Sequence, residues 1–427
     1  MSKKKDQPTT TDQPKDDAHA PVPASAQPEH SDSPTADSPT TGAPTTDSPA
    51  LDPTSPEVGE RILAAWADGS LVLPIQDSGT PVPLPGRHYS APLPEGLAGG
   101  ASVDLIGIGE RFVVWRLEPE DNAPLAVRIP HVPPQQRVQA LQHEIAALTH
   151  MPRGLGPSPV SSHEDPATSP IGLAYVAVTF ESGEPLAPES WNRTHLRIHA
   201  QRLARLHTVI APGRGPIAVA RDPWAEVPER PLSVLDEVDA LLATWRRDHA
   251  DVLSAHSLEP FLDAMRERVV DLDAQMRSVN AFCLVHGDLC ATNILWRTVA
   301  DGYGGTEPVP VFIDLEWAQA DDPARDLSSI GGTIHGGPWY VPMDEDLQTA
   351  FVTAYLKARE DLPMRLPSPG SPRAVRERML GWAAYERTAM LVHLAVHQDQ
   401  DSPHRQMRRD ALPLLRVSLA QEFGLKA

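Results

Sequence analysis

The chain has 427 residues, of which 46 are proline, and a formal net charge of −20. Its length exceeds that of one small domain and suits a two-lobed enzyme with additional segments. The acidic balance argues against nucleic acid or an anionic membrane as a partner, because neutralising phosphate needs surplus Lys and Arg. It fits a cationic substrate, or it serves solubility alone.

Two further features of the composition favour a cytoplasmic protein. The chain begins MSKKKDQ and stays polar, so it lacks the apolar core of a signal peptide, and no apolar run is long enough to span a bilayer. Cys283 and Cys290 are its only cysteines. Two cysteines exclude a disulfide framework, and without a cluster of histidines they cannot build a zinc site.

The N-terminal region divides into two parts. Residues 1–57 are rich in Pro, Ser, Thr and Asp and hold no aromatic residue, so they cannot bury enough apolar surface to offset the entropy of ordering. We therefore expect a disordered tail, with a tether or docking arm as the functional alternative. Residues 58–100 are expected to form an extension that packs on the enzyme or covers an edge. Helical periodicity predicts that it begins with a helix over residues 58–68.

Residues 101–183 are expected to form a small lobe that binds a nucleotide. Apolar, β-branched runs indicate strands, and one stretch with its apolar residues on a single helical face indicates a helix. Their order is typical of a small antiparallel sheet with one helix. The strands are predicted at residues 103–108, 111–117, 125–129 and 171–180, and the helix at residues 134–150.

Residues 184–427 are expected to form a larger, mostly helical lobe. It would hold the catalytic loop, the metal site and the acceptor site. The predicted fold class is therefore α+β, with a small β-rich lobe followed by a larger helical lobe and preceded by a disordered tail. The helices are predicted at residues 196–208, 232–247, 258–279, 346–359 and 374–397.

Two blocks in the larger lobe carry the chemistry. The first, LVHGDLCATNILW, places Asp288 five residues before Asn293, and the second, VFIDLEWAQADDPARDL, places Asp314 after a strand-like run. Phosphoryl transfer needs a carboxylate to receive the proton of the acceptor hydroxyl, and oxygen ligands that hold magnesium against the phosphates. Asp288 suits the first role, and Asn293 and Asp314 suit the second. Glu316, on the same side of an extended backbone, would assist at the metal.

These blocks resemble the signature of the aminoglycoside phosphotransferase superfamily, which includes macrolide phosphotransferases, choline kinase and homoserine kinase type enzymes. The shared pattern is His-Gly-Asp, an asparagine five residues on, an Ile-Asp block, and then Asp-Pro with a downstream Asp-Leu. The family shares the two-lobed fold of protein kinases. The resemblance implies a catalytic base at Asp288, support of its loop by His286, magnesium ligands at Asn293 and Asp314, a capping role for Asp322 and a bracing role for Asp326.

The small lobe also resembles this family, with one departure. Arg128, in Val-Arg-Ile-Pro, lies where such kinases carry a phosphate-binding lysine, and macrolide phosphotransferase-like members have the same Arg-Ile-Pro triplet. Glu144 would pair with Arg128, or be an ordinary solvated carboxylate. Gly107 and Gly109 would cover the phosphates, or form a plain hairpin turn. The resemblance places the hinge that binds adenine or guanine at Phe180, Glu181, Ser182 and Gly183.

The sequence says less about the acceptor. Cys290, Ala291 and Thr292 replace the residues usual before the asparagine, and Cys290 is expected to be a small filler. The stretch 331–337 either shapes the acceptor cleft or is a flexible loop. Four acidic residues are expected on solvated helix faces, and two aromatic residues in the core. These are Asp236, Asp239, Glu386 and Asp399, and Trp382 and Tyr385.

The predicted function is transfer of the γ-phosphate of ATP or GTP, with Mg²⁺, to a hydroxyl of a small molecule. An aminoglycoside- or macrolide-like antibiotic or metabolite, with a cationic group, is the favoured acceptor, which would connect the chain with antibiotic resistance. A kinase of Ser or Thr in a peptide, and a catalytically silent nucleotide-binding scaffold, remain as alternatives. The sequence leaves the oligomeric state open.

Overall fold

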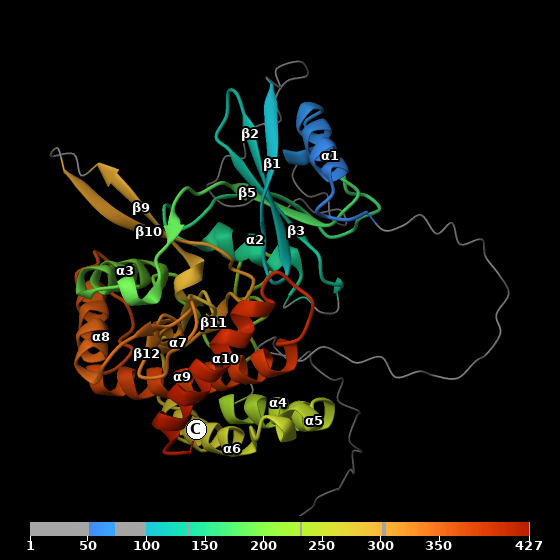
Figure 1. Cartoon of the computed structure of the whole chain (residues 1–427). Coiled ribbons are helices and arrows are strands. Elements are labelled where there is room, and N and C mark those ends of the chain that lie inside the picture. The colour runs from blue at the N-terminus through green and yellow to red at the C-terminus, as the bar shows by residue number, and fades with distance from the viewer. Residues whose placement is uncertain are drawn as a thin grey trace, which may run out of the picture.

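The computed structural model describes residues 51–72, 100–134, 137, 139–230, 233–300 and 305–426. Most of the expected tail, residues 1–50, and much of the expected extension, residues 73–99, lie outside the described residues. Within the described part, a five-stranded sheet with few helices lies above a larger mass of helices (Figure 1). The α+β, bilobal fold predicted from the sequence is confirmed.

The sheet of the small lobe is antiparallel throughout, with strand order β1-β2-β3-β5-β4. Helix α2, Leu141–His150, packs against β4 and β5. Burial of the apolar side chains of the sheet on both faces explains why β2, β3 and β5 are almost continuously apolar. The strands are β1 Ala101–Ile108, β2 Phe112–Pro119, β3 Leu125–Pro130, β4 Pro159–His163 and β5 Tyr175–Thr179.

The N-terminal extension covers the face of this sheet rather than its edge. Helix α1, Pro56–Ala67, and the short helix η1, Ser70–Val72, share one apolar core with the sheet, separate from the main core of the protein. Trp115 of β2 donates its indole N–H to the carbonyl of Pro53 at 2.9 Å, and the Tyr175 hydroxyl donates to the carbonyl of Leu71 at 3.2 Å. Residues 58–72 of the extension are therefore part of the folded lobe, and so are residues 51–57, for which the prediction of a disordered tail is wrong.

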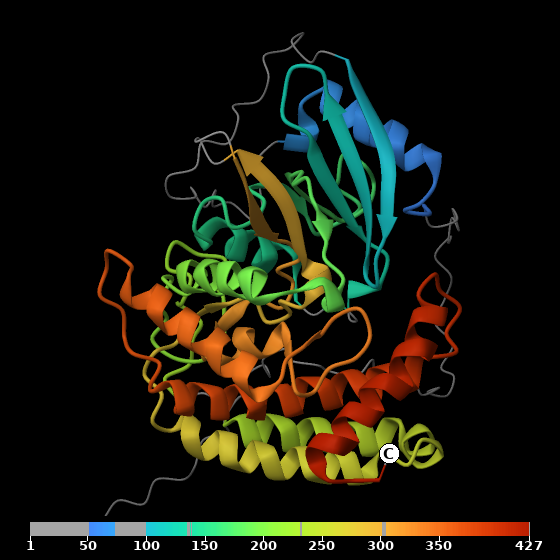
Figure 2. The same cartoon turned by 60° about the vertical axis from the view of Figure 1, so that its left-hand side comes forward.

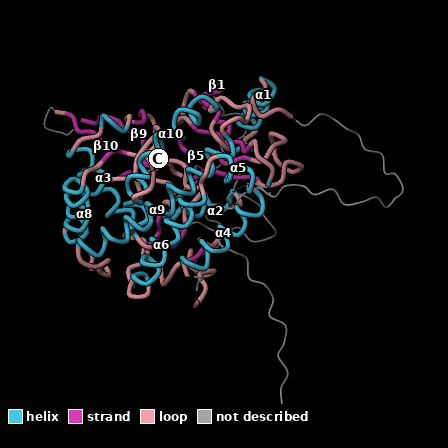
Figure 3. The backbone as a smooth tube through the Cα atoms, turned by 60° about the horizontal axis from the view of Figure 1, so that its bottom comes forward, coloured by secondary structure: helices cyan, strands magenta, loops and turns pink. Residues whose placement is uncertain are grey.

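The large lobe is built around one long helix, α9, Pro372–His397. It contacts α6, α7, α8 and α10, and Figure 2 shows it lying between the layer of α4 and α6 below and α7 and α8 above. Figure 3 shows how helices make up most of this lobe. The other helices are α3 Arg193–Leu206, α4 Val234–Asp248, α5 Ala250–Ala255, α6 Glu259–Met276, α7 Pro323–Ser329, α8 Glu345–Glu360 and α10 Arg405–Phe423.

Short strands position the two signature blocks between the lobes. The order β10-β9-β6 joins the hinge side to the strand that leads to Asp314, and the order β7-β11-β8 holds the start of the catalytic loop. Both short sheets are antiparallel, whereas β12 and β13 are parallel. The strands are β6 Glu184–Pro185, β7 Gly215–Pro216, β8 Cys283–Val285, β9 Ile294–Ala300, β10 Thr306–Phe312, β11 Gln319–Asp321, β12 Gly331–Gly332 and β13 Val341–Pro342.

Several predicted boundaries are wrong for physical reasons. The helix expected over residues 134–150 begins only at Leu141, where the carboxylate of Glu164 accepts a hydrogen bond from the backbone N–H of Gln142 at 3.1 Å. The strand expected over residues 171–180 begins at Tyr175, because Gly172 has a φ of +73° and its N–H donates to Ser169 in a turn. Helix α10 was not predicted; it carries Pro413 in its interior, a residue that normally ends a helix.

None of the described helices combines the length and the apolar character that a membrane crossing requires.

Candidate active site

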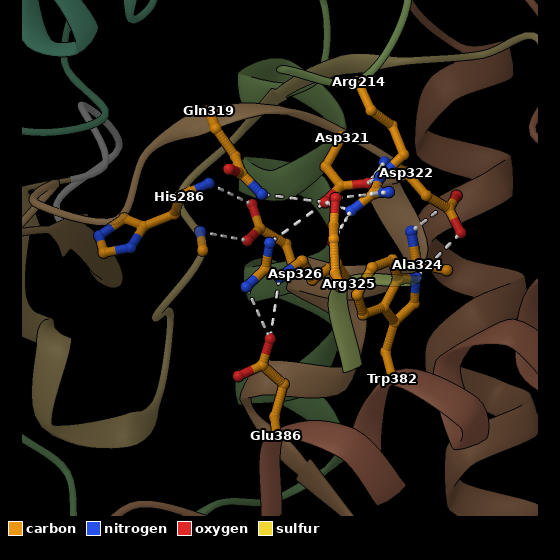
Figure 4. Close-up of polar contacts among 12 residues, drawn as sticks. Arg214, His286, Gln319, Asp321, Asp322, Ala324, Arg325, Asp326, Trp382 and Glu386 are labelled. Carbon is orange, nitrogen blue, oxygen red and sulfur yellow. Dashed lines mark hydrogen bonds and ion pairs between the residues drawn. The ribbon is translucent and has the colours of Figure 1, made fainter. Parts of the chain in front are cut away.

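The loop that carries Asp288 is held by one buried carboxylate. Asp326, near the start of α7, accepts hydrogen bonds from the backbone N–H groups of His286 at 2.8 Å and Gly287 at 2.9 Å (Figure 4). Burial opposes ionisation of Asp326, but a hydrogen bond from His207 and those from the loop outweigh it and lower the pKa of the carboxyl. The Nε2 of His286 donates to the carbonyl of Ile313 at 2.9 Å, which ties the loop to the second block.

Asp288 and Asn293 face one another across this loop. The amide Nδ2 of Asn293 donates to the carbonyl of Asp288 at 2.8 Å and to its carboxylate at 3.1 Å. Burial, together with the charges of Asp314 and Glu386, raises the pKa of Asp288 to about 7. A carboxylate with this pKa is suited to accept a proton near neutral pH. Because Nδ2 faces Asp288, the Oδ1 of Asn293 is left to face another group.

Arg128, on β3 of the small lobe, connects helix α2 with Asp314 of the second block. One guanidinium nitrogen donates to Glu144 of α2 and the other to Asp314, so the predicted pair of Arg128 and Glu144 forms. The guanidinium also lies over the ring of Phe112, 4.3 Å from its centroid. The alternative of a solvated Glu144 is wrong, since the side chain is buried. Burial raises the pKa of Glu144 despite the neighbouring cation.

The backbone at Asp314 differs from the expected extended strand. Strand β10 ends at Phe312, and Asp314 has a φ of +67°, a left-handed conformation that is uncommon for a residue other than glycine. Alternation along a strand therefore does not place Glu316, and that reasoning is wrong. Glu316 instead accepts a hydrogen bond from Arg111 at 3.1 Å. Strain of this kind is characteristic of functional sites.

The donor set fits a magnesium ion shared with a nucleotide. Asp314 offers a partly exposed carboxylate and Asn293 an amide oxygen, both hard oxygen ligands of the kind that magnesium prefers. Among the described residues, no group of three or more His, Cys, Asp or Glu side chains is placed to hold a metal alone. Oxygen atoms of the phosphates would complete the coordination, as is usual for magnesium.

The two glycines expected over the phosphates lie at the end of the β1–β2 hairpin. Gly107 belongs to β1, at a shift of register after Leu105, and Gly109 lies in the turn between β1 and β2. Gly109 donates its N–H to the carbonyl of Phe112 at 2.7 Å and closes the turn. The hairpin leads directly to Arg111, whose bond to Glu316 places its end at the site.

The expected hinge lies between β5 and β6. The N–H of Phe180 is already donated to the carbonyl of Pro124 at 2.8 Å, and the ring of Phe180 lies under the guanidinium of Arg116. Glu181 forms an ion pair with Arg297 at 2.9 Å, while Ser182 is exposed. The side chain of Glu181 is thus engaged in joining the hinge to β9 rather than turned freely to a ligand.

A buried charge network behind the loop was not predicted. Asp321 pairs with Arg214 at 2.8 Å and with Arg325 at 3.1 Å, and Arg325 also pairs with Glu386 at 2.8 Å (Figure 4). Glu386 was expected on a solvated face, which is wrong, because its side chain is only 21% exposed and pairs with the buried Arg325. Asp321 and Arg325 are only four residues apart, whereas Arg214 lies 107 positions from Asp321 and Glu386 lies 61 from Arg325, and such distant partners leave no local pattern.

Four further residues of the large lobe lie as expected from the sequence. Asp322 caps α7 by accepting from the N–H of Ala324 at 3.2 Å. Burial raises the pKa of the Cys290 thiol, which suits a filler rather than a reactive group. Trp382 and Tyr385 are buried, as expected. His207, which hydrogen-bonds Asp326 at 3.1 Å, was missed, although it ends the apolar LARLH run of α3.

The chain is similar to known proteins in sequence and in fold. Residues 102–374 match the phosphotransferase enzyme family. A candidate aminoglycoside phosphotransferase from Ralstonia eutropha shares 15% identity and a TM-score of 0.50, covering 78% of this chain and 95% of its own. A choline kinase from Cryptosporidium parvum shares 12% identity and a TM-score of 0.47, with 76% and 88% covered. A macrolide 2′-phosphotransferase from Brachybacterium faecium shares 19% identity and a TM-score of 0.41, with 73% and 91% covered.

No curated protein sequence matches the chain. The family match spans well over half of the chain and includes both signature blocks, the sheet of the small lobe and the hinge. The chain therefore belongs to the phosphotransferase enzyme family and is a kinase-like phosphotransferase.

Proposed function

We propose that the protein transfers the γ-phosphate of ATP, or of GTP, to a hydroxyl group of a small molecule with the help of Mg²⁺. The observation that carries the proposal is the hydrogen bond from Asn293 to the carboxylate of Asp288 at 3.1 Å, in a loop whose Asn293 carbonyl accepts from the N–H of Ile313, next to Asp314, at 3.1 Å. This supports a proton acceptor at Asp288 and oxygen ligands for a metal at Asn293 and Asp314, the arrangement that phosphoryl transfer needs.

Each residue has a separate task. Asp288 orients the acceptor hydroxyl and takes its proton as the oxygen attacks the γ-phosphorus. Arg128, held by Glu144, neutralises phosphate oxygens with a planar fork of donors. Asn293 and Asp314 would hold magnesium, which supplies positive charge against the phosphates. Asp326 and His286 keep the loop in place without touching the reacting atoms.

A cavity beside the catalytic loop supports a choice of acceptor. It has a volume of about 370 Å³ and reaches Thr292, the residue before Asn293. Its lining is mostly apolar, and Glu189 is its one charged residue among those described. An acceptor with an apolar body and a single amine fits this lining better than one with many amines. It is lined by Pro185, Leu186, Ala187, Pro188, Glu189, Thr292, Gly337, Pro338 and Leu414.

We therefore favour an amino-sugar antibiotic or metabolite of macrolide-like character over a polycationic aminoglycoside. The stretch 331–337, expected either to shape the acceptor cleft or to be a flexible loop, is anchored: Gly336 packs on the backbone of Leu415, and His335 donates its N–H to Ser418 at 2.9 Å. The cavity wall formed by Gly337 is thus held by helix α10.

The test is incubation of the protein with magnesium and ATP or GTP, against macrolides, aminoglycosides and a Ser/Thr peptide, with phosphate incorporation followed by mass. We expect a gain of one phosphate on a macrolide-like compound. A Glu189→Gln variant should raise KM for that compound and leave KM for ATP unchanged, whereas Glu184→Gln, on the neighbouring strand β6, serves as the matched control. Transfer to the peptide alone, or to no acceptor, would overturn the proposal.

A further inference from the structure

The end of the β1–β2 hairpin is held from two opposite sides. Arg111 turns toward the site and bonds Glu316 at 3.1 Å. Its neighbour Glu110 turns the other way and accepts a hydrogen bond from Arg408 of α10. Both residues lie in the turn between β1, which ends at Ile108, and β2, which begins at Phe112, so one short segment makes both contacts.

The contact with the C-terminal helices is built from several groups. Arg408 is 3% exposed and also donates to the carbonyl of His397 at 3.1 Å and to the side chain of Gln400 at 3.3 Å. The Nε2 of His393 lies 3.3 Å from the carboxylate of Glu110. Because these acceptors hold the guanidinium of Arg408 in place, it cannot move freely away from the carboxylate of Glu110, and the geometry of the ion pair is fixed.

A second bond strengthens the same contact. The Nε2 of His404, in the turn between α9 and α10, donates to the backbone carbonyl of Ile108 at 3.0 Å. The pKa of Glu110 agrees with a well-made pair: burial would raise it, but His393 and Arg408 lower it to about 2. In Figure 1 the lower end of the hairpin lies beside the turn that leads into α10.

The C-terminal residues of these contacts lie outside the part of the chain that matches the family. The match ends at residue 374, whereas His393, His404 and Arg408 belong to the end of α9, the turn and α10. The hairpin itself lies inside the matched part. The contact thus joins the matched part of the chain to the C-terminal segment that follows it.

We propose that His393, His404 and Arg408 form a C-terminal clamp that positions the glycine hairpin over the phosphates of the bound nucleotide. The proposal rests on the proposed function only in assigning the hairpin to the nucleotide. Such a clamp slows the release of the nucleotide, because the nucleotide can dissociate only after the hairpin has moved away from it. The clamp residues are positioning residues: they act through Glu110 and Ile108 and touch no reacting atom.

The test uses Glu110→Gln and Arg408→Gln in the full chain, with Arg409→Gln as the matched control. Arg409 is the next residue of α10, but it faces Asp399 at the surface. Hydrogen exchange of the amides in residues 105–112, without nucleotide, should become about tenfold faster in both variants and stay unchanged in the control. Dissociation of a fluorescent ATP analogue should accelerate by a similar factor.

Further outcomes separate the clamp from the catalytic assignment. Because Arg408 is buried, thermal melting checks that its variant still folds. Glu110→Gln breaks the same ion pair from a side chain that is about one third exposed, and so tests the clamp even if the Arg408 variant is unstable. The double variant should be no faster than either single one, as expected for residues acting through one contact. Unchanged hydrogen exchange, or faster exchange with unchanged release of the nucleotide analogue, would overturn the clamp. A protein that phosphorylates no acceptor but shows both changes would overturn only the proposed function.

Discussion

The carboxylate of Asp326 accepts a hydrogen bond at 2.9 Å from the backbone N–H of Gly287, a residue whose φ is +82°. The glycine lies so close to the second block that a Cβ atom there would meet the carbonyl oxygen of Trp317 at 2.3 Å. The glycine of His-Gly-Asp is therefore required twice, by its dihedral angle and by the close approach of another backbone. The position of Asp288 depends on this pair.

Replacing Gly287 by alanine should destabilise the fold strongly. The left-handed conformation costs about 1–2 kcal/mol for a residue with a Cβ, and the clash with a backbone atom adds a comparable amount. Gly154→Ala is the matched control, because Gly154 has a φ of +77°, but a Cβ atom added there would meet no atom of the described residues within 4 Å. Urea unfolding should show a loss of about 3 kcal/mol for Gly287→Ala and about 1 kcal/mol for the control. Equal losses would refute the close approach.

Replacing Arg128 by lysine should weaken nucleotide binding without unfolding the protein. Arginine reaches Glu144 with one nitrogen and Asp314 with the other, whereas a lysine ammonium is a single point that cannot span both. We expect KM for ATP to rise about tenfold, with a smaller fall in kcat. Arg205→Lys, on the exposed side of α3, should change neither constant. An unchanged KM in Arg128→Lys would remove Arg128 from the phosphate site.

The buried His199 should make stability depend on pH. Neither of its ring nitrogens has a hydrogen-bond partner within the described residues, and the ring stacks on Phe351 at 5.9 Å. Burial lowers its pKa to about 3, so as pH falls below about 6.5 the unfolded chain binds the proton first. The stability that His199 contributes is present above that pH and is lost progressively toward pH 3.

The contribution of His199 to the pH dependence of stability can be isolated with His199→Leu, which removes the titrating group. Between pH 7 and pH 5 the free energy of unfolding of the wild type should fall by about 2 kcal/mol more than that of the variant. The measurement is urea unfolding at both pH values. Parallel pH profiles for the two proteins would show that His199 is protonated in the folded state.

Much of the site could be predicted from the sequence because its residues are close along the chain. Asp288 and Asn293 lie in one loop, and the pair of Arg128 and Glu144 follows from a strand and the helix after it. The extension was expected to pack on the enzyme or to cover an edge, but the surface on which it packs could not be predicted. The bracing of the loop by Asp326 followed from the family resemblance and not from spacing.

Other features depend on contacts between distant residues and leave no local pattern. Glu386 was assigned to a solvated face because only helical periodicity was visible, whereas its partner Arg325 lies 61 positions away. Glu110 and Arg408 are separated by 298 positions. The conformation of Asp314 was missed because strand alternation assumes an extended backbone, and a φ of +67° breaks it.

The most direct test of the central claim is the turnover of Asp288→Asn with the acceptor found by the mass assay. The amide keeps the shape of the carboxylate but cannot take the proton of the hydroxyl, so kcat should fall about 10²- to 10⁴-fold while the affinity for the nucleotide stays within a few-fold of wild type. Asp271→Asn, on the exposed face of α6, is the control and should retain full activity. Wild-type turnover in Asp288→Asn would contradict the assignment of Asp288 as the catalytic base.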